Sequence, residues 1–177
     1  MIYVDANATY PVQPSHYDEV ARVLKEVDGN PSSIHASGRN AKIALEDSRA
    51  EVASMFGCRN SAITFTSGAT EGNNLVIQGV INKIKSGGVL PNIIISDTEH
   101  SAVKEPSKNL ANRELCELRI APVGKDGVVD VEGLLDLVDS HTALVCVMHV
   151  NNEVGSINPV KEIAERIKQI NSDTHVH

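Results

Sequence analysis

Residues 143–149 read ALVCVMH, an apolar run that no charged side chain interrupts before His149. A strand with one face in water alternates polar and apolar residues. A continuous apolar run is typical instead of a strand buried on both faces of a parallel sheet. Outward from this run, residues 92–96 (NIIIS) form a second expected strand, and both strands are followed at once by polar segments.

Helical and strand-like patterns alternate along the rest of the chain. Val20, Val23 and Leu24 recur at helical spacing, and Ser15 is the expected cap of their helix. Gly57 and the pair Gly87–Gly88 are the expected stops of two later helices. This alternation predicts an α/β fold with a mostly parallel sheet flanked by helices. The expected helices span 15–27, 39–56, 70–86, 101–112, 131–138 and 159–170; the expected strands span 62–66, 92–96, 115–120 and 143–149, with a turn at 124–127 and a further strand opening at THVH (174–177).

Composition excludes several classes of protein. Hydrophobic residues make up 41% of the 177 residues, which is typical of a globular chain, and the net charge is −7. No basic run stands out, so neither nucleic acid nor an anionic membrane is expected as a partner. The N-terminus (MIYVDANATYP) lacks the charged and apolar regions of a signal peptide, and a cytoplasmic protein is therefore expected. The three cysteines, Cys58, Cys116 and Cys146, show no zinc spacing and are expected to be reduced thiols, and Cys116 and Cys146 are expected to be buried.

Three polar segments follow expected strands, and ligands of α/β proteins bind beyond the carboxyl ends of the strands. The first, SGAT (67–70), can cradle a phosphate at a helix N-terminus or can be an ordinary capping turn. The second contains His100, which can stack on a planar ligand or cap a helix, and the neighbouring Glu99 can simply be a solvated side chain. The third contains Asn151 and Asn152, which suit a ligand or a turn.

The remaining polar candidates are weaker. The segment DANATYP (5–11) contains Asn7 and can be a simple terminal turn, and His35 in GNPSSIH (29–35) is expected to be structural. His175 and His177 alternate on one strand face, but two histidines without a third ligand do not predict a metal site.

Taken in order, five segments resemble the cysteine desulfurases, which belong to the class V aminotransferase group of fold-type I enzymes. The segments are YVDANATYPV, GNPSSIHASGR, ITFTSGATEGNN, SDTEHSAV and VMHVNNEVGSINPV. The resemblance implies pyridoxal 5′-phosphate (PLP) as cofactor, with its phosphate held by Ala69 and Thr70. It further implies that His100 stacks on the cofactor ring and carries protons, that Asn152 contacts cofactor and substrate, and that Asn7 lines the substrate side.

The resemblance also implies an activity and partners. Sulfur is removed from L-cysteine, giving L-alanine and an enzyme persulfide, and passes to an iron–sulfur scaffold or to tRNA thiolation. A homodimer is implied, with residues 1–14 as an arm at the active site and 15–177 as part of the PLP-binding large domain. Tyr10 and Gly72 depart from the family, which usually has Thr and Ser at these positions.

The family's pyridinium Asp, Schiff-base Lys and nucleophilic Cys match no residue here and are expected beyond His177. The 177-residue chain alone is therefore expected to be inactive. Three interpretations stay open: a truncated or cleaved desulfurase, half of a split enzyme, or a non-catalytic scaffold or binding half with this fold. Selenocysteine lyase shares the same motifs and is an alternative activity.

Overall fold

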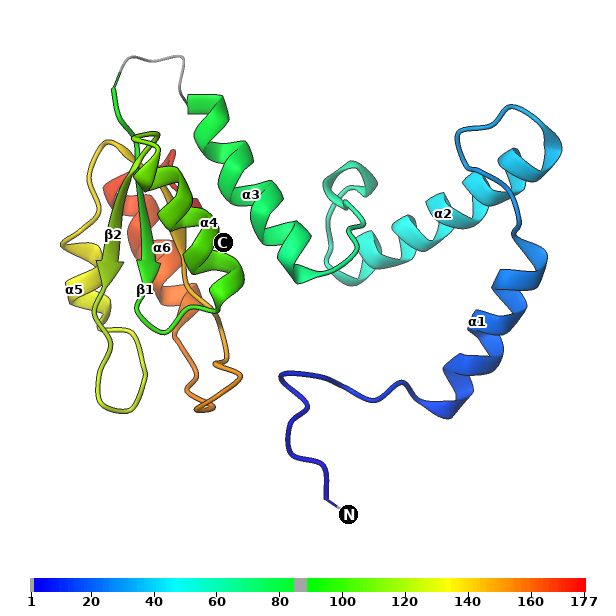
Figure 1. Cartoon of the computed structure of the whole chain (residues 1–177), viewed down its shortest axis with the longest axis horizontal. Helices are drawn as coiled ribbons and strands as arrows, with labels where there is room; N and C mark the ends of the chain where they lie inside the picture. Colours follow the sequence, from blue (N-terminus) through cyan, green and yellow to red (C-terminus); the bar gives the residue numbers. More distant parts are fainter. Residues whose placement is uncertain (1, 85–88) are drawn as a thin grey trace. The chain divides into compact units, whose positions relative to one another are not determined.

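The computed structural model describes residues 2–84 and 89–177. The chain forms two compact units, one comprising the residues up to Ala8 together with Thr66–His177 and the other comprising Thr9–Phe65. Figure 1 labels the α-helices of both units and two of the strands. No helix within the described ranges is long and apolar enough to cross a membrane.

The unit Thr9–Phe65 contains α1 (Pro14–Glu26), α2 (Ala36–Met55) and a short 3₁₀ helix, η1 (Asn60–Ala62). The prediction that Ser15 caps α1 is wrong: Gln13 is the N-cap, and Pro14 takes the first helical position, where its missing N–H costs nothing. His35 caps α2 through a hydrogen bond from the Gly38 N–H to its ring, in line with the expected structural role. Gly57, with φ of 62°, follows the end of α2 as predicted.

The predicted strand at 62–66 is wrong. Residues 60–62 form η1, and residues 63–66 pair with no strand within the described residues. A strand needs a neighbour for its backbone groups. Here the Ile63 carbonyl accepts a 2.6 Å hydrogen bond from the Arg49 guanidinium instead of from a neighbouring strand. The same guanidinium lies 5.1 Å from the centre of the Phe65 ring.

The other unit is built on a four-stranded parallel sheet with strand order β2-β1-β3-β4, which confirms the predicted α/β class. In β1, Ile93 and Ile95 pack in one core and Ile94 packs in the other, so both faces of the strand are buried. This explains the apolar runs without alternation. The strands are β1 (Asn92–Ser96), β2 (Glu117–Ala121), β3 (Thr142–Cys146) and β4 (His175–Val176).

Two helices cover each face of the sheet, as can be followed in Figure 1. On one face, α3 (Ala69–Ile84) contributes Ile77 and Ile81, and α4 (Ser101–Asn112) contributes Val103 and Leu110. On the other, the core includes Leu134 and Leu135 of α5 and Ile163 and Ile167 of α6; the bounds of these helices are Val131–Leu135 and Val160–Ile170. The sheet is thus the middle of three layers, and its carboxyl ends remain open for a ligand.

Several boundaries differ from the sequence prediction. β3 ends at Cys146, three residues early, because the Met148 N–H is bound by the Glu99 carboxylate. The helix expected over 131–138 is shorter, and α4 continues through Pro106 with the predicted bounds. The expected stop at Gly87–Gly88 lies outside the described residues.

All three cysteines are free thiols, as predicted. Burial raises the pKa of Cys116 to about 11, and burial together with the charge of Glu99 raises the pKa of Cys146 to about 12. These two are therefore protonated and unreactive at neutral pH. Cys58 is exposed.

Acidification should destabilise the fold partly through Asp139, which lies at the opposite end of the sheet from the cavity described below. Burial raises the pKa of this carboxyl, but hydrogen bonds from Arg119, the His141 N–H and Asn92 outweigh it and lower the pKa from 3.8 to about 2. Such a group stabilises the fold fully above pH 3.8, and this contribution is lost as the pH falls through 2. Urea unfolding at pH values from about 5 to 2 should show a smaller loss of stability for Asp139→Asn than for the wild type.

The matched control for this prediction is Asp136→Asn, because Asp136 is exposed. This variant should lose as much stability on acidification as the wild type. Equal acid sensitivity of the Asp139 variant would show that the hydrogen bonds to its charge do not stabilise the fold.

Candidate active site

A cavity of about 680 Å³ lies at the carboxyl ends of β1 and β3. This volume is in the usual range for small-molecule sites, and the position is where α/β sheets bind ligands. Six segments of one unit line it: the N-terminal segment, the start of α3, the start of α4, the segment after β3, the start of α6 and the end of β4. The residues relevant to its chemistry are Asn7, Ala69, Thr70, Asn73, Glu99, His100, Asn152 and His177.

The first turn of α3 supplies backbone donors to the cavity. Ala69 and Thr70 begin the helix, and the N–H groups of a first turn have no partner within their helix. The Glu71 carboxylate accepts a 2.6 Å hydrogen bond from the Ser67 N–H and therefore does not bind the N–H groups of the first turn of α3. The same hydrogen bond lowers the pKa of Glu71. The Ser67 N–H is therefore used within the turn, while Ala69 and Thr70 keep donors suited to an anion.

His100 lines the same cavity and is also the N-cap of α4. Its Nδ1 accepts a 3.1 Å hydrogen bond from the Ala102 N–H. In the neutral ring, an accepting Nδ1 requires that Nε2 carries the proton. The two interpretations of this histidine are therefore compatible: capping fixes the ring, and Nε2 stays available to a ligand.

The two neighbouring asparagines, Asn151 and Asn152, differ in their hydrogen bonds. Asn151 is buried, and its amide is used by the protein: it donates to the Thr98 carbonyl and accepts from the N–H groups of Glu153 and Val154. Asn152 is half-buried and lines the cavity, and no hydrogen bond to its side chain is formed within the described part of the chain. Asn151 thus shapes the loop, while Asn152 has its amide free for a ligand.

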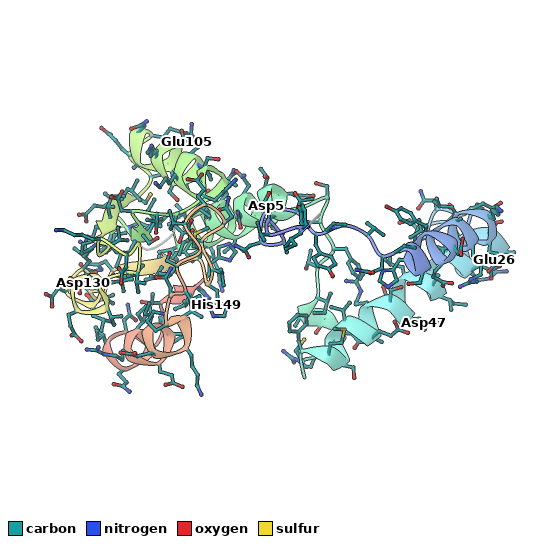
Figure 2. All side chains as sticks on the ribbon, turned by 90° about the horizontal axis from the view of Figure 1, so that it is seen from below. Asp5, Glu26, Asp47, Glu105, Asp130 and His149 are labelled. Atoms are coloured by element: carbon teal, nitrogen blue, oxygen red, sulfur yellow. The ribbon has the colours of Figure 1, made fainter. Side chains whose placement is uncertain are left out.

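The N-terminal segment is tied to the cavity by Asn7. Its side-chain amide donates to the Val150 carbonyl over 2.9 Å, joining residues that are 143 positions apart. The amide oxygen of Asn7 accepts no hydrogen bond within the described residues and can face a ligand. Figure 2 labels Asp5 and His149, which mark the two segments that this hydrogen bond connects.

Sequence reasoning missed three residues that line the cavity. The interpretation of Glu99 as solvated is wrong, because it is only 6% exposed and accepts hydrogen bonds from Ser96 and from Met148. His177 has a ring nitrogen 2.9 Å from the Asn73 side-chain oxygen, and burial lowers the pKa of His177 against the opposing charge of Glu99. The contacts of Glu99 with Met148 and of His177 with Asn73 join residues far apart in the sequence, and no local pattern marks them.

His175 does not share the cavity with His177, so the structure does not bring the two together there. In residues 2–84 and 89–177, no group of three or more His, Cys, Asp or Glu side chains could hold a metal ion.

The parallel sheet, its flanking helices and a cavity at the strand ends define an α/β protein with a cavity where such sheets bind ligands. The family model described as "Aminotransferase class-V" matches residues 2–177. The chain therefore belongs to the class-V aminotransferase family.

Within this family, the chain is similar to proteins with more specific names. The chain is 39% identical over 168 residues to "Cysteine desulfurase IscS" of Dictyoglomus turgidum, an alignment that covers 95% of this chain and 42% of that protein. It is 37% identical over 186 residues to "Selenocysteine lyase" of Bos taurus, covering 96% of this chain and 43% of that protein. A solved structure named "NIFS-LIKE PROTEIN" superposes with a TM-score of 0.92 at 38% identity, covering 99% of this chain and 48% of the other. The chain thus spans less than half the length of these relatives.

Proposed function

We propose that the cavity is part of the PLP site of a cysteine desulfurase. The observation that carries the proposal is the meeting of Asn7, Thr70, His100 and Asn152, from four segments, around one cavity. In the proposed reaction, the C–S bond of L-cysteine breaks, the sulfur passes to a cysteine thiol of the enzyme as a persulfide, and L-alanine leaves. The likeness to "Cysteine desulfurase IscS" supports this choice of reaction.

The residues present fit PLP. Its phosphate needs N–H and hydroxyl donors, which the first turn of α3 offers through Ala69 and Thr70. The approach to these donors is open, since a Cβ added at Gly68 would meet no atom within 4 Å. The flat ring of His100 suits a planar cofactor, and the free amide of Asn152 suits a ring hydroxyl or a carboxylate.

Each residue has a role that follows from its surroundings. Thr70 and the α3 N–H groups bind the phosphate, and His100 holds or moves a proton at Nε2 because its Nδ1 is occupied. Asn152 orients the cofactor and the amino acid, and Asn7 contributes its free oxygen on the substrate side. When bound, PLP supplies an electron sink that activates the amino acid.

The remaining parts of the proposal concern the whole protein. We place it in the cytoplasm as a homodimer that delivers sulfur to an iron–sulfur scaffold or another sulfur acceptor. Residues 1–14 would be the arm that contributes to the active site, and 15–177 would be part of the PLP-binding domain.

A second candidate function is that of a selenocysteine lyase. The 37% identity to the Bos taurus protein of that name favours it nearly as much as the desulfurase relative favours the first. The two activities differ in the chalcogen that leaves the amino acid and not in the residues that line the cavity.

The test is an assay of the complete protein, supplied with PLP and a thiol reductant, on L-cysteine and on L-selenocysteine. We expect alanine and sulfide from L-cysteine in equal amounts. Selenide release without sulfide release would establish the second candidate, and the absence of both products would overturn the proposed function.

A further inference from the structure

Glu99 is a buried carboxylate that the proposed function does not use. It is 6% exposed and lines the cavity. Across residues 2–84 and 89–177, no basic side chain forms an ion pair with it. Because a buried charge is costly without hydrogen bonds or a counter-charge, the surroundings of both of its oxygens need an explanation.

The two oxygens differ. Oε1 accepts hydrogen bonds from the Ser96 hydroxyl over 3.1 Å and from the Met148 N–H over 2.5 Å. Oε2 accepts no hydrogen bond within the described part of the chain. The fully buried side-chain atoms that lack a partner there are Asn92 Oδ1 and Ser156 Oγ, so Oε2 is not fully buried. Oε2 therefore keeps an opening, and the opening that Glu99 lines is the cavity.

The cavity is consequently polarised. The first turn of α3 presents N–H groups and the positive end of a helix dipole, while Glu99 presents a negative charge. A ligand with an anionic group for α3 and a hydrogen-bond donor for Glu99 matches both ends. The two bonds to Oε1 fix the carboxylate beforehand, so binding does not have to order it.

We propose that Glu99 is a ligand-binding residue, whose Oε2 accepts a hydrogen bond from an N–H or ammonium group of a ligand with its phosphate at the first turn of α3. The position of the phosphate rests on the proposed function. The role of Glu99 is separate from phosphate binding, because Glu99 recognises the nitrogen-bearing part of the ligand.

The test compares two probes by calorimetry. Pyridoxamine 5′-phosphate carries a phosphate, a ring nitrogen and an ammonium group, whereas benzyl phosphate keeps a ring and a phosphate without any N–H donor. Glu99→Gln retains the side-chain length and an oxygen for Ser96 and Met148 but removes the charge. It should weaken binding of pyridoxamine 5′-phosphate roughly tenfold and leave benzyl phosphate unchanged or slightly tighter.

Two controls separate ligand binding from structural effects. Glu105→Gln removes an exposed carboxylate from α4, labelled in Figure 2, and should change neither affinity. Ser96→Ala removes a donor to Oε1 but leaves Oε2 in place, so the preference for the nitrogen-bearing probe should persist. Loss of that preference in Ser96→Ala, or equal weakening of both probes by Glu99→Gln, would show that Glu99 is only a brace between strand ends.

A comparison within the wild-type protein needs no variant. Pyridoxamine 5′-phosphate should bind at least about tenfold more tightly than benzyl phosphate, which lacks both the N–H donors for Glu99 and the ring hydroxyl for Asn152. Equal affinities would overturn the role of Glu99 while the phosphate site stands. Failure of both probes to bind would overturn the proposed function, and this inference with it.

Discussion

Replacing His100 with alanine should lower the kcat of the complete enzyme by about a hundredfold or more, with a much smaller effect on folding. The ring lines the cavity, and its orientation is fixed by the hydrogen bond from the Ala102 N–H to Nδ1. A positioned imidazole that transfers a proton contributes typically about 10²–10⁴-fold to rate. Its removal empties part of an open cavity and no part of the core, so the protein should remain folded. Steady-state kinetics on L-cysteine and urea unfolding measure the two effects.

Two further variants isolate the imidazole from the helix cap. His100→Asn keeps a good N-cap but removes the ring, so it should be as slow as the alanine variant while unfolding like the wild type. His35 is a second histidine N-cap, with its Nδ1 bound by the Gly38 N–H, and it does not line the cavity. His35→Ala should therefore lose about as much stability as His100→Ala and retain kcat. Wild-type kinetics for His100→Asn would remove the imidazole from the mechanism.

Replacing Thr70 with valine should weaken PLP binding by roughly tenfold to a hundredfold. Valine keeps the shape of the side chain and removes the hydroxyl that lies at the first turn of α3. Hydrogen bonds to a charged phosphate are stronger than bonds between neutral groups, and losing one costs about 1.5–3 kcal/mol. The backbone N–H groups remain, so binding should weaken without being abolished. Calorimetric titration of the cofactor-free protein with PLP measures the change.

The control for this variant is Thr64→Val, since Thr64 is exposed and does not line the cavity. It should bind PLP as the wild type does. An unchanged dissociation constant for Thr70→Val would mean that residues 67–70 are only a capping turn, and that the phosphate binds elsewhere.

The parts of the fold that follow from local signals were predictable from the sequence. β1 and α4 have the predicted bounds, because an apolar run ends at Ser96 and a capping side chain precedes Ser101. The failure at 62–66 has the opposite cause: its apolar pattern is suitable for a strand, but pairing needs a neighbour that local sequence does not specify. Likewise, β3 ends early because the Met148 N–H donates a hydrogen bond to Glu99, which lies 49 positions away in the sequence.

Some residues of the candidate site were likewise predictable from the sequence and others were not. His100 and Asn152 could be singled out because each follows a strand, and the rule for parallel sheets brings such segments together. Thr70 lines the same cavity although the run before it is not a strand, so its place follows from the helix that it opens. Their chemical roles remain predictions. Glu99 and the pair His177–Asn73 could not be found, since burial of one and contact of the other two across 104 positions arise only from the packed structure.

The hydrogen bond between Asn7 and Val150 has a consequence for how the protein is made. Asn7 is synthesised before its acceptor, which follows 143 residues later. At about 5–20 residues per second, the N-terminal segment waits roughly 7–30 s without its partner. During that interval the side chain of Asn7 lacks this hydrogen bond. Docking of this segment is therefore a late event in biogenesis, and the cavity is completed only after both strands beneath it have been translated.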